Sequence, residues 1–87
     1  MRLDRFLKVS RLIKRRTLAK EVCDQGRVLL NGRVAKAASE VEVGDRLTIN
    51  FGTRTMTVEV AAIKENARVE EASQMYQILG PEGTLRP

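Results

Sequence analysis

The chain has 87 residues, with 16 Lys and Arg against 11 Asp and Glu, and a formal net charge of +5. This length supports one small domain, whose core buries about 60–65% of the unfolded surface. The absence of His and the single Cys exclude zinc fingers, Ser–His and Cys–His catalytic centres and disulfide scaffolds. The three aromatic residues, Phe6, Phe51 and Tyr76, are too few for a platform that stacks the bases of single strands.

The positive charge is concentrated in the N-terminal part of the chain. Residues 1–36 hold eleven Lys and Arg against three acids, a local charge of +8, whereas residues 37–87 hold five against eight, a local charge of −3. A polarised molecule of this kind is expected to present its basic end to a polyanion.

Two helices are predicted within the basic part. The first has a regular apolar or small face, formed by Leu3, Phe6, Leu7 and Ser10. The second has its apolar stripe on Leu18, Ala19, Val22 and Cys23, with Gly26 placed as its C-terminal cap. At 100° per residue, Arg16 and Lys20 lie about 40° apart at the border of that stripe, so both are positioned to contact a ligand.

After Gly26 the hydrophobic period changes to two, which predicts strands. Asn31-Gly32 predicts a tight hairpin, because both residues tolerate positive φ. A second hairpin is predicted at residues 52–54, between alternating apolar and polar residues at 46–51 and 55–60.

The pattern of the C-terminal residues predicts a short helix followed by a frayed tail. The helix is indicated by the spacing of Ala72, Met75, Tyr76 and Leu79, and Gly80-Pro81 is expected to end it. Packing of Met75 and Tyr76 against the sheet is favoured over docking of a partner. The predicted fold is therefore α+β, with two N-terminal helices followed by a small antiparallel sheet and a short C-terminal helix.

No catalytic constellation is found. General acid–base catalysis needs a group of tuned pKa with a partner, and no pair of acids is evident. Cys23 falls on the apolar stripe of the second helix, where a buried, inert thiol is favoured over a nucleophile. We therefore predict that the chain is not an enzyme and takes no cofactor or metal.

Asp4 is an acid inside the basic first helix, and three interpretations stay open. It is placed to favour the helix dipole, to orient Arg2, Arg5 or Arg16, or to accept a hydrogen bond from a ribose hydroxyl.

The position of the cations favours contacts with phosphate and sugar on folded RNA. A DNA-reading helix needs residues such as Asn, Gln or Ser to read base edges, whereas the corresponding segment here is Lys14-Arg15-Arg16-Thr17. A general DNA-binding or structured-RNA-binding module stays the alternative. The candidate RNA-binding residues are Arg2, Asp4, Arg5, Lys8, Arg11, Lys14, Arg15, Arg16 and Lys20.

Several motifs in a fixed order resemble the S-four RNA-binding domain. They are Arg2-Leu3-Asp4-Arg5-Phe6-Leu7, Arg16-Thr17-Leu18-Ala19-Lys20, Gly26-Arg27-Val28, Asn31-Gly32 and Val43-Gly44-Asp45-Arg46-Leu47. The resemblance covers about residues 1–50, and the ordered set is more specific than any one motif. Arg15 departs from the pattern, since many members carry Ser there. The resemblance implies that Arg2, Asp4 and Arg16 face RNA. It also disfavours an RNA-modifying enzyme, because catalytic members carry an additional domain.

The whole chain, including residues 8–16 and Met75-Tyr76, resembles a family of short bacterial ribosome-associated quality control proteins related to a ribosome-associated heat-shock family. The resemblance implies binding to the rRNA and the peptidyl-site tRNA of large ribosomal subunits blocked by peptidyl-tRNA. It also implies a partner factor that recruits alanyl-tRNA and extends the stalled chain with a C-terminal alanine tail.

We expect an RNA-binding domain at residues 1–63, with its core motif at about 1–50, and a C-terminal extension at residues 64–87. We expect a monomer. A location in the cytoplasm is also expected, since one unpaired Cys suits a reducing compartment. The basic amphipathic start also fits a transit peptide or a membrane-surface helix, but it continues without a break into the second helix, so no membrane partner is expected.

Overall fold

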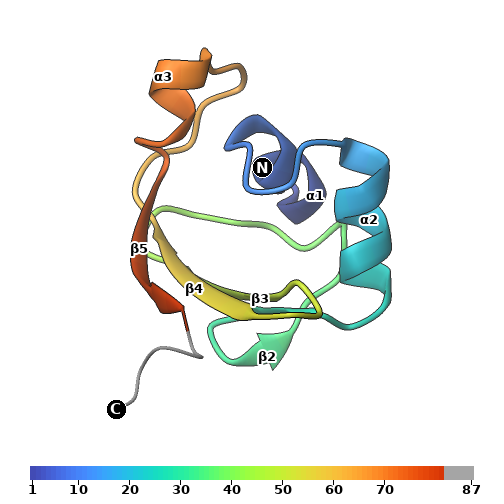
Figure 1. The fold of residues 1–87 in the computed structure, drawn as a ribbon. Coiled ribbons are helices and arrows are strands. Elements are labelled where there is room, and N and C mark those ends of the chain that lie inside the picture. Colours follow the sequence, from blue (N-terminus) through green and yellow to red (C-terminus); the bar gives the residue numbers. More distant parts are fainter. Residues whose placement is uncertain (82–87) are drawn as a thin grey trace.

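The computed structural model describes residues 1–81, which form three helices and one five-stranded sheet (Figure 1). The elements in chain order are α1 (Leu3–Val9), α2 (Arg16–Asp24), β1 (Val28–Leu30), β2 (Arg33–Val34), β3 (Arg46–Asn50), β4 (Thr55–Val60), α3 (Val69–Ala72) and β5 (Tyr76–Pro81). The strands lie in the order β2-β1-β3-β4-β5, and each neighbouring pair is antiparallel. The predicted α+β architecture is confirmed.

The start of α1 is held by a segment that is distant in sequence. No side chain caps this helix. Instead, the N–H of Leu3 donates to the carbonyl of Ser39 at 2.8 Å and the N–H of Asp4 donates to the carbonyl of Ala37 at 3.1 Å. Two of the four unpaired N–H groups of the helix start are satisfied in this way. The backbone that carries Arg2 and Asp4 is therefore fixed against the body of the protein.

A tight connection places α2 against α1 (Figure 1). Arg11 adopts a φ of 64°, and the N–H of Ile13 donates to the carbonyl of Leu7 at 3.1 Å, which turns the chain within a few residues. The side chain of Ile13 is buried. The basic residues of the connection are thus carried by an ordered turn between the two helices.

Helix α2 ends at Asp24, and Gly26 closes its C-terminus, as predicted. Gly26 has a φ of 75°, its N–H donates to the carbonyl of Cys23 at 2.9 Å, and the N–H of Arg27 donates to the carbonyl of Val22 at 3.1 Å. This pair of hydrogen bonds is a Schellman motif, in which glycine supplies the left-handed residue.

The core lies between the helices and one face of the sheet. The apolar side of α1 is fully buried through Leu3, Phe6 and Leu7. Alternate residues of the central strands meet it, as the period of two predicted. They are Val28, Leu47, Ile49, Val58 and Val60.

The predicted Asn31-Gly32 hairpin is confirmed. The two residues have φ values of 53° and 86°, which both central positions of a type I′ turn require. The side chain of Asn31 also ties the turn to the next strand, because its Oδ1 accepts from the N–H of Arg46 at 2.9 Å and its Nδ2 donates to Asp45 at 3.1 Å.

The C-terminal part contains a short helix, but not at the residues whose spacing indicated it. Helix α3 ends at Ala72, and Tyr76–Pro81 forms β5, which pairs with β4. The helical assignment was wrong beyond Ala72, and so was the role of Gly80-Pro81 as a helix end, because the backbone of residues 76–81 pairs with β4. Met75 is fully buried and Tyr76 is half-buried, which confirms that both pack inward.

Two further sequence expectations are not decided by the fold. The expected frayed tail, where it covers residues 82–87, lies outside the described residues, and the domain boundary after residue 63 stays a prediction. Among residues 1–81, no helix combines the length and the apolar character needed to cross a bilayer.

Candidate nucleic-acid interface

Four of the nine candidate residues gather around a shallow cavity at the side of the molecule where α1 and α2 meet. Its volume is about 330 Å³, and it is lined by Arg2, Asp4, Arg16, Thr17 and Lys20. We call these five residues the arginine cluster. The shared face predicted for Arg16 and Lys20 agrees with this grouping.

A buried carboxylate organises the arginine cluster. The side chain of Asp4 is only 3% exposed. Arg2 donates to it through Nε at 3.3 Å and through Nη2 at 3.4 Å, and Arg16 donates through Nε at 3.4 Å. Both oxygens of Asp4 are therefore occupied by guanidinium groups, which come from the residue preceding α1 and from the first turn of α2.

The two arginines keep part of their hydrogen-bonding capacity for an external ligand. Their side chains are 49% and 48% exposed. Each guanidinium has five N–H donors in a planar fork, and only the Nε group of Arg16 is used within residues 1–81. Such a fork matches the oxygens of a phosphate better than a lysine does. Two cations share one buried anion, so a positive charge remains at the surface.

The structure favours one of the three interpretations of Asp4. Asp4 pairs with Arg2 and Arg16, whereas the ion pair of Arg5 is with Glu65. Its position in the first turn of α1 also suits the helix dipole. Both oxygens are buried and accept hydrogen bonds from guanidinium groups, which favours the orienting role over contact with a ribose hydroxyl.

Arg5 is used within the fold. Its Nη2 lies 3.1 Å from Oε1 of Glu65 and 3.1 Å from the carbonyl of the same residue. This pair ties α1 to the segment that precedes α3. The four remaining candidates are exposed and form no ion pair within residues 1–81; they are Lys8, Arg11, Lys14 and Arg15.

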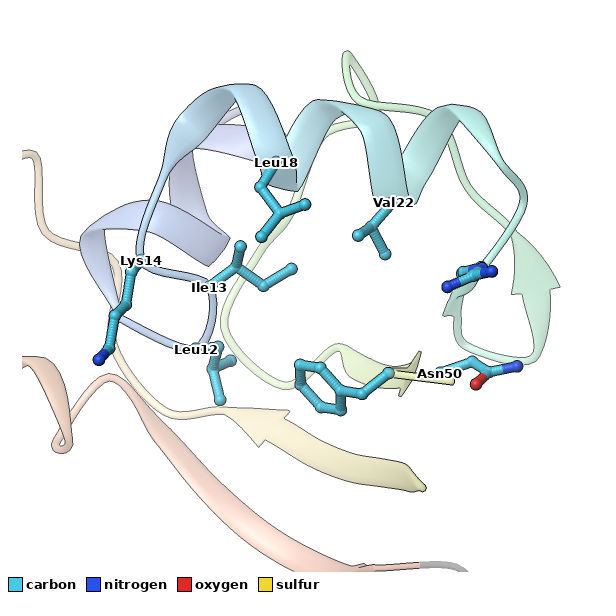
Figure 2. A pocket seen from close by; sticks show the side chains of 8 residues that line it. Leu12, Ile13, Lys14, Leu18, Val22 and Asn50 are labelled. Atoms are coloured by element: carbon cyan, nitrogen blue, oxygen red, sulfur yellow. The ribbon is translucent and has the colours of Figure 1, made fainter. Parts of the chain in front are cut away.

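Two features were missed by sequence reasoning. Thr17 lines the cavity of the arginine cluster. Its position three residues before Lys20 on α2 places the two side chains on neighbouring parts of the helix surface, and this spacing could have identified it. Leu18, expected on the apolar stripe, is 48% exposed. Its side chain reaches the wall of an open groove between α2 and the end of β3 (Figure 2), so the opposite element does not cover it.

Cys23 has no nucleophilic character. The residue is 2% exposed, and burial, together with the negative charges of Asp4 and Asp24, raises the pKa of its thiol to about 11. The thiol is therefore protonated at neutral pH and inert, which agrees with the interpretation from the sequence. Within residues 1–81, no group of three or more His, Cys, Asp or Glu side chains is arranged to hold a metal ion.

Comparison with known proteins identifies the family. The family model of the S4 domain matches residues 1–47. The chain belongs to the S4 domain family. The matched residues include α1, α2, β1, β2 and the start of β3, and all members of the arginine cluster lie within this S4 domain.

Its relatives match almost the whole chain. The RQC P-site tRNA stabilizing factor of Halalkalibacterium halodurans is 63% identical over 78 residues, which span 90% of this chain and 89% of that protein. The protein of the same name from Bacillus subtilis is 61% identical over 82 residues, which span 94% and 95% of the two chains.

A solved structure matches the S4-domain fold at similar coverage. The trimeric heat shock protein 15 of Vibrio cholerae superposes with a TM-score of 0.84 at 34% identity, covering 90% of this chain and 80% of that chain. The resemblance to ribosome-associated quality control proteins and to the heat-shock family is thus confirmed.

Proposed function

We propose that the chain is a non-enzymatic RNA-binding factor that acts on stalled large ribosomal subunits. It binds rRNA and the peptidyl-site tRNA on subunits that are still obstructed by peptidyl-tRNA. It supports the addition of a C-terminal alanine tail by a partner factor that recruits alanyl-tRNA. It works as a monomer in the cytoplasm, through binding alone.

The observation that carries the proposal is the buried Asp4 between Arg2 and Arg16. An acid in this position lowers the local positive charge, so it is not explained by a need for charge alone. Its hydrogen bonds fix the two guanidinium groups beside Lys20. A pre-oriented pair of forks loses less entropy on binding a phosphate than two free side chains do.

The relatives support the same class of partner. Two proteins that are more than 60% identical over nearly their whole length are named RQC P-site tRNA stabilizing factors. The arginine cluster lies in the part of the chain that matches the S4 domain. A phosphate-binding surface on a small domain is the chemistry that holding a tRNA requires.

Co-sedimentation with purified large subunits that carry peptidyl-tRNA tests the proposal. We expect binding that falls steeply with salt, because each neutralised phosphate releases counterions. Arg16→Ala is expected to weaken binding by about 1–3 kcal/mol and to lower the slope of log affinity against log salt by about one unit.

Arg33→Ala is the matched control. Arg33 is exposed on β2 and does not line the arginine cluster, and the substitution removes the same charge. We expect a much smaller loss of affinity for this variant. A protein that stays at the top of the gradient at low salt contradicts the proposal.

A competition experiment separates RNA from DNA as the partner. Structured RNA and duplex DNA of equal length compete for the protein at matched salt. The proposal requires preference for RNA, whereas equal or stronger competition by duplex DNA favours the alternative of a general DNA-binding module.

A further inference from the structure

A second concave site lies on the other side of α2 from the arginine cluster. It is a groove of about 350 Å³ between α2, the connection that precedes it and the end of β3. Its lining residues are Leu12, Ile13, Lys14, Leu18, Val22, Arg27, Asn50 and Phe51. Figure 2 shows Leu18 and Val22 projecting from α2 toward Leu12 and Ile13, with Lys14 and Asn50 at opposite ends.

The walls of this groove are largely apolar. Leu18 is 48% exposed and Val22 and Phe51 are half-buried, so apolar surface is open to a ligand. The guanidinium carbon of Arg54 lies 5.7 Å from the centre of the Phe51 ring, which adds a cation beside the groove. The volume is at the low end of the range for sites that hold one small organic group.

The polar groups at its rim are donors and cations. Oδ1 of Asn50 accepts from the N–H of Gly52 at 2.8 Å, which fixes the amide and leaves its Nδ2 without a partner within residues 1–81. Lys14 and Arg27 are exposed and form no ion pair within the same residues. No Asp or Glu lines the groove. An apolar wall with a free donor and flanking cations complements a base with its phosphates.

We propose that this groove binds one unstacked nucleotide of an RNA chain. The base lies against Ile13, Leu18, Val22 and Phe51, Nδ2 of Asn50 donates to an acceptor on the base edge, and Lys14 and Arg27 take the flanking phosphates. This inference rests on the proposed function, because the RNA that the arginine cluster grips supplies the nucleotide. It adds base contact to a domain whose few aromatic residues indicated phosphate contacts alone.

An aliphatic side chain of a protein partner is the competing occupant. It would use the apolar walls but would leave the amide of Asn50 and the two cations without a role. The free amide group is a donor, so an exocyclic carbonyl such as O4 of uracil is a suitable partner. Uridine is for this reason the probe of choice.

Titration by NMR with two tetranucleotides of equal charge tests the proposal. One is tetrauridylate, and the other is the same backbone without bases. We expect tetrauridylate to shift the methyl resonances of Ile13, Leu18 and Val22 and the side-chain amide of Asn50. The abasic chain is expected to leave these resonances unchanged and to bind about fivefold more weakly or worse.

Leu18→Glu is the decisive variant, and Val43→Glu is its control. Leu18 is half-exposed and is the third residue of α2, where an acid suits the helix dipole, so the fold is retained. Val43 is 61% exposed and lies outside the groove. Leu18→Glu is expected to abolish the advantage of tetrauridylate over the abasic chain, and Val43→Glu to preserve it.

The outcomes separate this inference from the proposed function. Equal binding and equal shifts with both tetranucleotides overturn the nucleotide site, while salt-sensitive binding to large subunits would leave the proposed function standing. If Leu18→Glu loses alanine tailing but binds tetrauridylate as wild type does, the nucleotide site is also overturned, and a side chain of a protein partner is the favoured occupant. Failure of the wild-type chain to bind any RNA overturns both.

Discussion

At the scale of single residues, Asp4 matters more than any one cation. A carboxylate that is 3% exposed would be costly without partners. Here it accepts from Arg2 and Arg16, and it lies at the start of α1, where the backbone is held by Ala37 and Ser39. The arrangement converts two long side chains into a fixed surface.

Asp4→Asn tests this role. The substitution removes a negative charge, so a simple electrostatic account expects tighter RNA binding. We expect affinity for large subunits to fall about threefold or more instead, because the arginines lose a charge-assisted acceptor. Binding of the variant and of Glu21→Gln is measured at one salt concentration.

Glu21→Gln supplies the matched control for Asp4→Asn. Glu21 is exposed on α2 and forms no ion pair within residues 1–81. It gives the same change of net charge without disturbing the arginine cluster, and unchanged or slightly tighter binding is expected. If both variants bind more tightly, Asp4 does not orient the arginines.

The raised pKa of Cys23 predicts a dependence of stability on pH. The folded state keeps the thiol proton up to a pKa of about 11, compared with 9.0 for an unperturbed thiol. The unfolded state thus binds fewer protons between these values, and the free energy of unfolding falls as pH rises from about 9 to about 11. The full effect is at most about 3 kcal/mol. Denaturant unfolding of wild type and Cys23→Ala across this pH range measures the effect. If the free energy of unfolding changes equally with pH in both proteins, the prediction is wrong.

At the scale of elements, local sequence patterns predicted the structure correctly, whereas the pairing of β5 with β4 was not predicted. The spacing of Leu3, Phe6 and Leu7 and the Asn31-Gly32 pair each specify their structure within a few residues. The spacing of residues 72–79 also fits a helix. Residues 76–81 instead form a strand, because β4 offers an edge for pairing. Nothing within these residues indicates that such an edge is available.

The Asn31-Gly32 turn gives a prediction on stability. Gly32 has a φ of 86°, and a Cβ placed there meets no atom within 4 Å. Gly32→Ala therefore costs only the backbone strain of the left-handed region, about 1 kcal/mol. Urea unfolding measures this cost. Thr53→Ala, in the exposed second hairpin turn, is expected to stay within about 0.5 kcal/mol of wild type. Equal stability of the two variants contradicts the prediction.

The candidate site could be predicted only where its residues are close together in sequence. The shared face of Arg16 and Lys20 follows from helix geometry alone. The pairing of Arg5 with Glu65 joins residues far apart in sequence, and the groove between Leu18 and Phe51 depends on where α2 lies relative to the end of β3. The sequence contains no local signal for either feature.

At the scale of the whole molecule, charge and architecture agree. Residues 1–36, with a local charge of +8, include both helices that carry the arginine cluster. The C-terminal residues of net negative charge contribute β3, β4 and β5, which complete the core. A field of this polarity is expected to steer the helical end toward a polyanion such as RNA.

A cryo-microscopy reconstruction of particles isolated with the tagged protein would show directly which RNA the arginine cluster contacts. We expect large subunits that carry a tRNA in the peptidyl site, with Arg2, Arg16 and Lys20 against RNA phosphates. A chain bound through the exposed face of its sheet, or particles without tRNA or large subunits, would contradict this expectation.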